Sequence, residues 1–295
     1  MADVAQNGTF RWGIASTGSI AAKMCEALAS SPDAEIVAVG SRTQPSADAF
    51  AQRFGIARAH GTYDALWADD EVDIVYIASP HSHHHAMTIA ALDAGKHVLC
   101  EKAFAVNAAQ AREMVEAAHR NDRFLMEAMW TWFIPAVVDI RRRVSDGVIG
   151  ELRVVEANFG IPVTDPDGRH RRIDLAGGAM LDIGIYPITF ARFLAGEPVD
   201  AKVSGTLGAT GVDTNVGGVV RFATGTLGVF HTSLDMMSDM RASIYGTLGR
   251  IDVDAPFHHP TGFTIRVHGE DPIRVDLPNR GPVSYTHLTL PTTPY

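Results

Sequence analysis

The sequence predicts an α/β protein in which a doubly wound parallel sheet is followed by an α+β domain with an open, mostly antiparallel sheet. In the first half, short β-branched runs alternate with amphipathic helical stretches, a pattern typical of βαβ units and hence of parallel strands. In the second half, strand-like runs follow one another with turn residues between them, which indicates antiparallel neighbours.

The elements of the first half follow from the period of their apolar residues. The predicted strands are Phe10–Ser16, Glu35–Gly40, Val72–Ala78 and His97–Cys100. The predicted helices are Ser19–Ser30, Ser46–Phe54, about His84–Ala94, and a helix that Asn107 caps and that runs to about Arg120. Ligands of such sheets bind beyond the carboxyl ends of the strands, so functional residues are expected there.

The second half is assigned in the same way. The predicted strands are Leu152–Phe159, Ala201–Leu207, Gly217–Ala223, Leu227–Leu234, Arg241–Tyr245 and Phe263–Val267. Helical patterning is found mainly in Pro135–Asp146 and Tyr186–Leu194. We therefore expect one domain over residues 1–128 and a second over 129–281.

Residues 282–295 differ in kind. From Val283 onward the chain has no charged residue and no apolar period, and Val283–Thr292 resembles the translation of a transposase adapter used in sequencing libraries. We interpret this segment as a foreign tail and keep it out of the fold; the alternative is a threonine-rich terminal strand. On this interpretation the second domain is incomplete, and the strand edge left uncovered makes the chain unstable or aggregation-prone.

Composition argues against several classes of protein. A net charge of −9 disfavours nucleic acid as a partner, because phosphate binding needs a positive surface. No apolar run approaches the roughly 18 residues of a membrane span, and two cysteines, Cys25 and Cys100, do not make a disulfide framework. These observations predict a soluble cytoplasmic protein.

The first strand runs into Ser16-Thr17-Gly18-Ser19-Ile20-Ala21, which occupies the place of a G-x-G-x-x-G turn. Such a turn brings the backbone close to a pyrophosphate at a helix N-terminus, although a tight turn also uses glycine for its own reasons. The second strand ends in Ser41-Arg42, where an NAD-preferring protein would place an acid. A hydroxyl beside an arginine favours a 2′-phosphate, so residues 1–128 are predicted to bind NADP, with NAD as the alternative.

Two further motifs follow strands. Four histidines in Pro80–His85 suggest a metal site, but they cannot all point inward, and we expect no metal there; His84 is expected to start a helix. Cys100-Glu101-Lys102-Ala103 follows the next strand, and Lys102 could hold a substrate hydroxyl. Taken alone, Glu101-Lys102 is also a common solvated pair.

The last motif is Gly177-Gly178-Ala179-Met180-Leu181-Asp182-Ile183-Gly184-Ile185-Tyr186-Pro187. On a helix, Asp182 and Tyr186 share a face. A tyrosine ordinarily titrates near pH ~10, so it needs a nearby cation to move a proton at neutral pH, and Lys102 is the candidate. The alternative is a capping aspartate and a core tyrosine.

Together with Ala94-Gly95-Lys96-His97-Val98-Leu99-Cys100 and Glu127-Ala128-Met129-Trp130-Thr131, these motifs resemble the glucose–fructose oxidoreductase, inositol dehydrogenase and MocA (Gfo/Idh/MocA) family over about Phe10–Gly281. Within it the chain is most similar to the branch of dihydrodiol and NADP-dependent D-xylose dehydrogenases. The resemblance implies a hydride transfer between NADP and a CH–OH group of a sugar or vicinal diol. It implies a catalytic group of Lys102, Asp182 and Tyr186, and a cofactor site lined by Gly18, Ser19, Ile20, Ser41, Arg42, Pro80, His84 and Glu101.

The resemblance also implies a homodimer formed through the second sheet. Alternatives are a sugar ketone or aldehyde reductase of the same family, a non-catalytic dinucleotide-binding regulator, and a structural oligomer subunit. Two departures bear on the substrate: the family's Glu-Lys-Pro is Glu101-Lys102-Ala103 here, and Trp132 stands where related sequences often have arginine. Three arginines before Gly177 are expected to be solvated loop charges, with contact to the substrate as the alternative: Arg169, Arg171 and Arg172.

Overall fold

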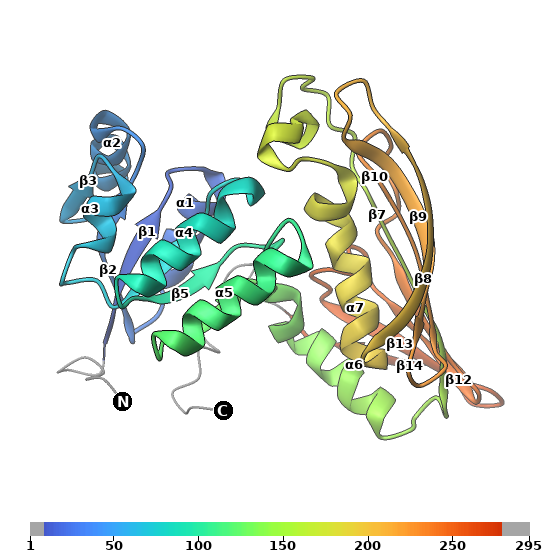
Figure 1. Cartoon of the computed structure of the whole chain (residues 1–295). Helices are drawn as coiled ribbons and strands as arrows, with labels where there is room; N and C mark the ends of the chain where they lie inside the picture. Colours follow the sequence, from blue (N-terminus) through green and yellow to red (C-terminus); the bar gives the residue numbers. More distant parts are fainter. Residues whose placement is uncertain (1–8, 279–295) are drawn as a thin grey trace. The chain divides into compact units, whose positions relative to one another are not determined.

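The computed structural model of the protein describes residues 9–278, which divide into two compact units at Met129/Trp130 (Figure 1). The tail predicted at 282–295 lies outside the described residues. Each unit has its own sheet, and the expected pairing of a parallel sheet with a mostly antiparallel one is confirmed.

The first unit is built on a six-stranded sheet in the order β3-β2-β1-β4-β5-β6, with every pair parallel. Its strands are β1 Phe10–Ala15, β2 Ala34–Gly40, β3 Arg58–His60, β4 Ile74–Ile77, β5 His97–Cys100 and β6 Leu125–Glu127. Its helices are α1 Ser19–Leu28, α2 Gln44–Phe54, α3 Tyr63–Trp67, α4 His81–Asp93 and α5 Ala108–Arg120.

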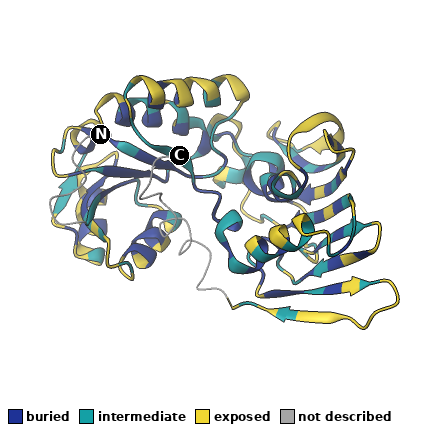
Figure 2. Cartoon of the chain, turned by 90° about the horizontal axis from the view of Figure 1, so that it is seen from below, coloured by how far each residue is buried: buried dark blue, intermediate teal, exposed yellow. Residues whose placement is uncertain are grey.

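Apolar packing holds the helices on this sheet. The central strands are buried along most of their length, whereas α4 and α5 alternate buried and exposed positions (Figure 2). Buried side chains of α3, α4 and α5, such as Leu66, Leu92 and Met114, form one cluster with the sheet. The predicted cap is confirmed, because the side chain of Asn107 accepts a hydrogen bond from the backbone N–H of Gln110 at 3.0 Å.

The second unit is built on an eight-stranded sheet in the order β14-β13-β12-β11-β7-β10-β9-β8. Its strands are β7 Leu152–Gly160, β8 Pro198–Leu207, β9 Asp213–Phe222, β10 Leu227–Ser233, β11 Ala242–Gly246, β12 Gly249–Val253, β13 Gly262–Val267 and β14 Ile273–Asp276. All pairs are antiparallel except β7 with β10. Its helices are α6 Pro135–Ser145 and α7 Ile185–Ala195.

Helix α7 lies along one face of this sheet (Figure 1). The approach is close: a Cβ built on Gly228 in β10 would lie 3.1 Å from Cβ of Ala191 in α7. Before α7 comes a π-helical turn, Met180–Gly184, and a Cβ on Gly184 would lie 3.0 Å from Cγ2 of Thr232. Glycine at these points lets the helix and the sheet come together.

Within residues 9–278, the helical stretch Ile173–Ala195 is the one that is long and apolar enough to cross a membrane by length and composition. Its mean hydropathy is 1.2, and 56% of the window is buried inside the protein. Packing of α7 against β7 and β10 accounts for that apolar character, as in the core helix of a folded domain.

Candidate active site

The carboxyl ends of four strands of the first unit meet at one edge of the sheet. Backbone hydrogen bonds join these ends: Ser16 N–H donates to Gly40 O, Ala78 N–H to Ala15 O, and Glu101 N–H to Ile77 O, each at 3.0 Å. Residues that follow β1, β2, β4 and β5 are therefore neighbours. The structure brings together at this edge the predicted residues Gly18, Ser19, Ile20, Ser41, Arg42, Pro80, Glu101 and Lys102.

The turn between β1 and α1 leaves open space beside its backbone at Gly18. Gly18 has an ordinary φ of −78°, and a Cβ built there would meet only Ser16 Oγ, at 3.9 Å. The fold itself therefore does not require glycine at position 18, and the open space suits a ligand that approaches the backbone. The first turn of α1 has unbonded N–H groups and contains no acidic residue, so its positive dipole end is uncompensated.

Ser16, which stands at the first glycine position of the motif, adopts a φ of 105°. Residues other than glycine rarely adopt this backbone conformation, which costs on the order of 1–3 kcal/mol. Ser16 thus has the positive φ that favours glycine, although the residue is not a glycine.

The end of β2 places Ser41 and Arg42 next to this turn. Ser41 is buried, and its N–H donates to His60 O at 3.0 Å, whereas Arg42 is exposed. Burial raises the pKa of Tyr63, while the charge of Arg42 and a hydrogen bond with Ser16 partly offset that rise. Tyr63, which sequence reasoning did not single out, therefore lies close to both Ser16 and Arg42.

The end of β4 leads into α4, which begins at His81 rather than at His84 as predicted, with Pro80 as its N-cap. His84 is completely buried: its ring nitrogens lie 2.8 Å from Ala103 O and 2.9 Å from Ser79 O. Burial lowers the pKa of His84 below its usual value. His84 thus ties the segment before α4 to the segment after Lys102 and exposes no surface to a ligand.

The end of β5 carries Glu101 and Lys102. The Glu101 carboxylate accepts hydrogen bonds from the hydroxyl of Tyr76 and from the backbone N–H of Lys102. Glu101 is 5% exposed, so the alternative interpretation of a solvated Glu-Lys pair does not hold for this residue. The carboxylate instead fixes the backbone at the point where Lys102 begins.

In the second unit, Asp182 and Tyr186 lie on the π-helical turn and on the first turn of α7. Both are buried, at 3% and 6% exposure. A π-turn widens the helix by one residue per turn and is frequent at functional sites. The structure thus divides the predicted catalytic group: Lys102 belongs to the first unit, and Asp182 and Tyr186 belong to the second.

Two side chains that sequence reasoning did not assign contact the carboxylate of Asp182. Arg169 Nη2 donates to Asp182 Oδ1 at 2.9 Å, and His170 Nε2 lies 3.3 Å from Asp182 Oδ2. The expectation of solvated arginines is wrong for Arg171, which donates to Val163 O, Leu234 O and Asp235. The side chain of Arg169 stays 44% exposed although it pairs with Asp182. The expectation holds for Arg172, which pairs with Asp174 in solvent.

An aromatic enclosure surrounds the ring of Tyr186. Its ring centroid lies 5.1 Å from that of His258, 5.4 Å from Phe159 and 5.8 Å from Trp130. The pair His258-His259 in the sequence was the signal that could have pointed to this enclosure. Trp132 instead stacks on Phe193 of α7, with ring centroids 5.4 Å apart.

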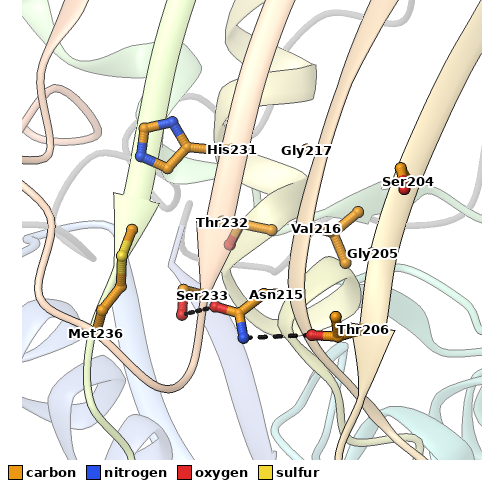
Figure 3. Close-up of a pocket in the computed structure, with 10 residues that line it drawn as sticks. All are labelled: Ser204, Gly205, Thr206, Asn215, Val216, Gly217, His231, Thr232, Ser233 and Met236. Atoms are coloured by element: carbon orange, nitrogen blue, oxygen red, sulfur yellow. Dashed lines mark hydrogen bonds between the residues drawn. The ribbon is translucent and has the colours of Figure 1, made fainter.

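A hollow of ≈ 350 Å³ lies on the face of the second sheet away from α7, over β8, β9 and β10. Figure 3 shows Ser233, Asn215 and Thr206 joined by hydrogen bonds along its rim, at 2.5 Å and 3.4 Å. None of the residues predicted for the active site lines it. Among residues 9–278, no group of three or more His, Cys, Asp or Glu side chains is arranged to hold a metal ion.

Comparison with solved structures gives the same fold for the chain. A 3-ketoreductase from Actinomadura kijaniata, described in complex with NADP, matches with a TM-score of 0.84 at 29% identity, covering 94% of this chain and 87% of the other. Variants of that enzyme described in the same way replace a tyrosine by phenylalanine and a lysine by alanine. The aldose-aldose oxidoreductase of Caulobacter crescentus matches with a TM-score of 0.86 at 25% identity, covering 95% and 87%.

Curated relatives are closer in sequence. The trans-1,2-dihydrobenzene-1,2-diol dehydrogenase of Bos taurus is 38% identical over 270 residues, covering 89% of this chain and 80% of the relative. The NADP-dependent D-xylose 1-dehydrogenase of Hypocrea jecorina is 37% identical, covering 92% and 79%.

Two family descriptions match in succession. Residues 10–129 match the oxidoreductase family with an NAD-binding Rossmann fold, and residues 137–252 match the Gfo/Idh/MocA C-terminal domain. Together with the open turn at Gly18 in the first unit and the buried Asp182 and Tyr186 in the second, these matches show that the chain belongs to the Gfo/Idh/MocA family of oxidoreductases.

Proposed function

We propose that the protein is an NADP-dependent dehydrogenase that acts on a CH–OH group of a sugar or vicinal diol. The observation that carries the proposal is the turn at Gly18, where the backbone and the N-terminus of α1 are open to a pyrophosphate. The diol and D-xylose dehydrogenases among the relatives support the substrate class. We assign the cofactor to residues 1–128, the substrate to 129–281, and the protein to the reducing cytoplasm, which suits its two free, buried cysteines.

In this proposal Gly18, Ser19 and Ile20 hold the pyrophosphate, and Ser41 and Arg42 hold the 2′-phosphate. When bound, NADP supplies the carbon that accepts the hydride. Pro80 and Glu101 line the cofactor, and His84 acts through the carbonyl groups that it fixes.

The chain's own groups handle the proton. As the hydride leaves the carbinol carbon, the phenolate oxygen of Tyr186 takes the proton of the substrate hydroxyl and becomes a neutral phenol. The ammonium group of Lys102 orients that hydroxyl and favours the phenolate form of Tyr186. Asp182 holds the arrangement, and the same groups run the reaction in reverse.

A second candidate is the reduction of a ketone or aldehyde on a sugar, favoured by the likeness to a 3-ketoreductase. A non-catalytic regulator is disfavoured, because it has no need of a buried carboxylate beside a buried tyrosine. The deciding experiment is to follow NADP reduction with a panel of aldoses and vicinal diols, and NADPH oxidation with ketosugars. Absence of turnover in both directions with bound cofactor would reject both enzyme proposals.

Replacing Arg42 by alanine is expected to weaken NADP binding by roughly 10- to 100-fold and to leave NAD binding nearly unchanged. A charge-assisted contact to a phosphate contributes about 1.5–3 kcal/mol, and NAD lacks that phosphate. Isothermal titration with both cofactors measures the effect, with Arg53→Ala, an exposed arginine on α2, as the matched control. An equal loss for both cofactors would remove Arg42 from the 2′-phosphate site.

We also propose that the sheet face away from α7 forms a homodimer. On that face Val219 pairs with Val229, and Leu227 pairs with Val154, which places apolar side chains on β9, β10 and β7 beside the charged Arg221 and Glu156. Val219 and Leu227 are each 37% exposed, so a partner sheet that covered this face would remove both side chains from water.

Val219→Arg is therefore expected to convert the dimer to a monomer, as measured by light scattering, while Val138→Arg, an exposed position on α6, leaves the mass unchanged. A monomeric wild-type protein at micromolar concentration would contradict the proposal.

A further inference from the structure

The carboxylate of Asp182 is almost entirely removed from water. A buried carboxylate is costly unless cationic groups and hydrogen bonds compensate for the lost hydration. Both oxygens of Asp182 have such partners: Arg169 Nη2 at 2.9 Å from Oδ1, and His170 Nε2 at 3.3 Å from Oδ2. These two partners are adjacent residues on one short 3-10 turn, Arg169–Arg171.

Two glycines let this turn reach Asp182. A Cβ on Gly177 would lie 2.6 Å from the carbonyl oxygens of both Arg169 and His170, so a larger residue would push the turn away. The N–H of Gly178 donates to His170 O at 2.9 Å. Gly178 has a φ of +117°, and a Cβ there would lie 2.1 Å from Asp213 Oδ1. The Gly177-Gly178 pair is thus a docking point for the segment that carries Arg169 and His170.

The other side of the turn is anchored independently. Arg171 Nη2 donates to Leu234 O at 3.1 Å and to Asp235 Oδ1 at 2.8 Å, at the end of β10. The turn is therefore fixed to the sheet by Arg171 and to the start of the π-turn by the glycines. Because the backbone of the turn is already fixed, Arg169 and His170 can contact the Asp182 carboxylate without a further loss of backbone freedom.

Arg169 differs from its neighbour Arg172 in what it contacts. Arg172 pairs with Asp174 two residues away, and both side chains are more than half exposed. Arg169 contacts a carboxylate that is 4% exposed, yet its own side chain is 44% exposed. One end of its guanidinium thus contacts Asp182, and the side chain remains within reach of small molecules in solution.

We propose that Arg169, assisted by His170, is a positioning residue that holds the carboxylate of Asp182 ionised and oriented during hydride transfer. The inference rests on the proposed function and deepens it. Asp182 cannot turn freely once both its oxygens are held, so its relation to Tyr186, four residues along the same helical stretch, is fixed. Loss of Arg169 leaves the carboxylate buried with only the imidazole as a partner from this turn.

The test uses the full chain with NADP and the best substrate of the panel, in the wild-type, Arg169→Ala, Arg169→Lys and Arg172→Ala forms. For Arg169→Ala we expect kcat to fall on the order of 100-fold, because small misplacements of a catalytic group have effects of this size. The substrate KM and the NADP Kd should stay within about two-fold, since the same principle concerns the reacting geometry rather than binding. Arg169→Lys should recover part of kcat, and Arg172→Ala should match the wild type.

Chemical rescue separates positioning from folding. Added guanidinium or methylguanidine, at concentrations that leave the wild-type rate unchanged, should raise the kcat of Arg169→Ala and should not raise that of Asp182→Asn. An unchanged kcat in Arg169→Ala overturns the proposal. A loss of kcat that comes with an equal loss of thermal stability, and that neither lysine nor guanidinium restores, overturns it as well. A wild-type chain that turns over no member of the panel rejects the proposed function itself, an outcome distinct from an active wild type with an indifferent Arg169.

Discussion

Tyr186→Phe and Lys102→Met are each expected to lower turnover by about 10²- to 10⁴-fold, the range that positioned proton-transfer groups contribute. NADP should still bind to both variants. Phenylalanine keeps the ring contacts of Tyr186 with Trp130, Phe159 and His258, so the second unit keeps its packing. The backbone N–H of Lys102, which donates to Glu101, is unaffected by a change of side chain.

Steady-state rates and cofactor titrations measure the two effects separately. The matched controls are Tyr245→Phe, on β11, and Lys202→Met, on the exposed strand β8, which should both behave as the wild type. Wild-type turnover in Tyr186→Phe or in Lys102→Met would remove that residue from the mechanism. Loss of NADP binding would instead mean that the residue acts in the cofactor site.

Gly18→Ala is expected to reduce NADP affinity strongly without harm to the fold. The new Cβ meets no protein atom closer than 3.9 Å, and the φ and ψ of Gly18 suit alanine. It would, however, occupy the space where the pyrophosphate approaches the backbone. Crowding of this kind costs about 1–3 kcal/mol, which corresponds to roughly 5- to 150-fold in Kd.

The control is Gly13→Ala in β1, where the new Cβ would lie 2.9 Å from Val72 Cγ1 and 3.2 Å from Leu66 Cδ1. That substitution should lower the melting temperature, whereas Gly18→Ala should keep it or raise it slightly through the lost freedom of the unfolded chain. If Gly18→Ala binds NADP as tightly as the wild type, the pyrophosphate does not lie at this turn.

Long elements were predictable because each has enough residues to show a period. Strand β7, with nine residues, was predicted to within one residue of its observed bounds, and the Asn107 cap of α5 was recognised from its side chain alone. Strands β3 and β6 were missed because three residues show no alternation, and their place is set by pairing with β2 and β5. Strands β12 and β14 were also missed, and the structure places both of them by pairing with β13.

The part of the candidate site that follows the strands of the parallel sheet could be predicted from the sequence. Gly18, Arg42 and Lys102 each follow a strand, and the carboxyl ends of parallel strands meet at one edge. Arg169 and His170 were not predictable, because the approach of their turn to Asp182 depends on packing against Gly177 rather than on any sequence period. His84 was expected at the cofactor, but two carbonyl oxygens hold it inside the protein.

The two cysteines make local unfolding of the first unit measurable. Both are fully buried, and burial raises the pKa of Cys25 to about 12 and that of Cys100 still further from its usual value. Since the thiolate is the reactive form, maleimides and disulfide reagents are not expected to react with these thiols in the folded protein at neutral pH. The rate of alkylation therefore measures how often α1 or β5 unfolds locally. The second unit has no cysteine among residues 130–278, so it contributes nothing to that rate.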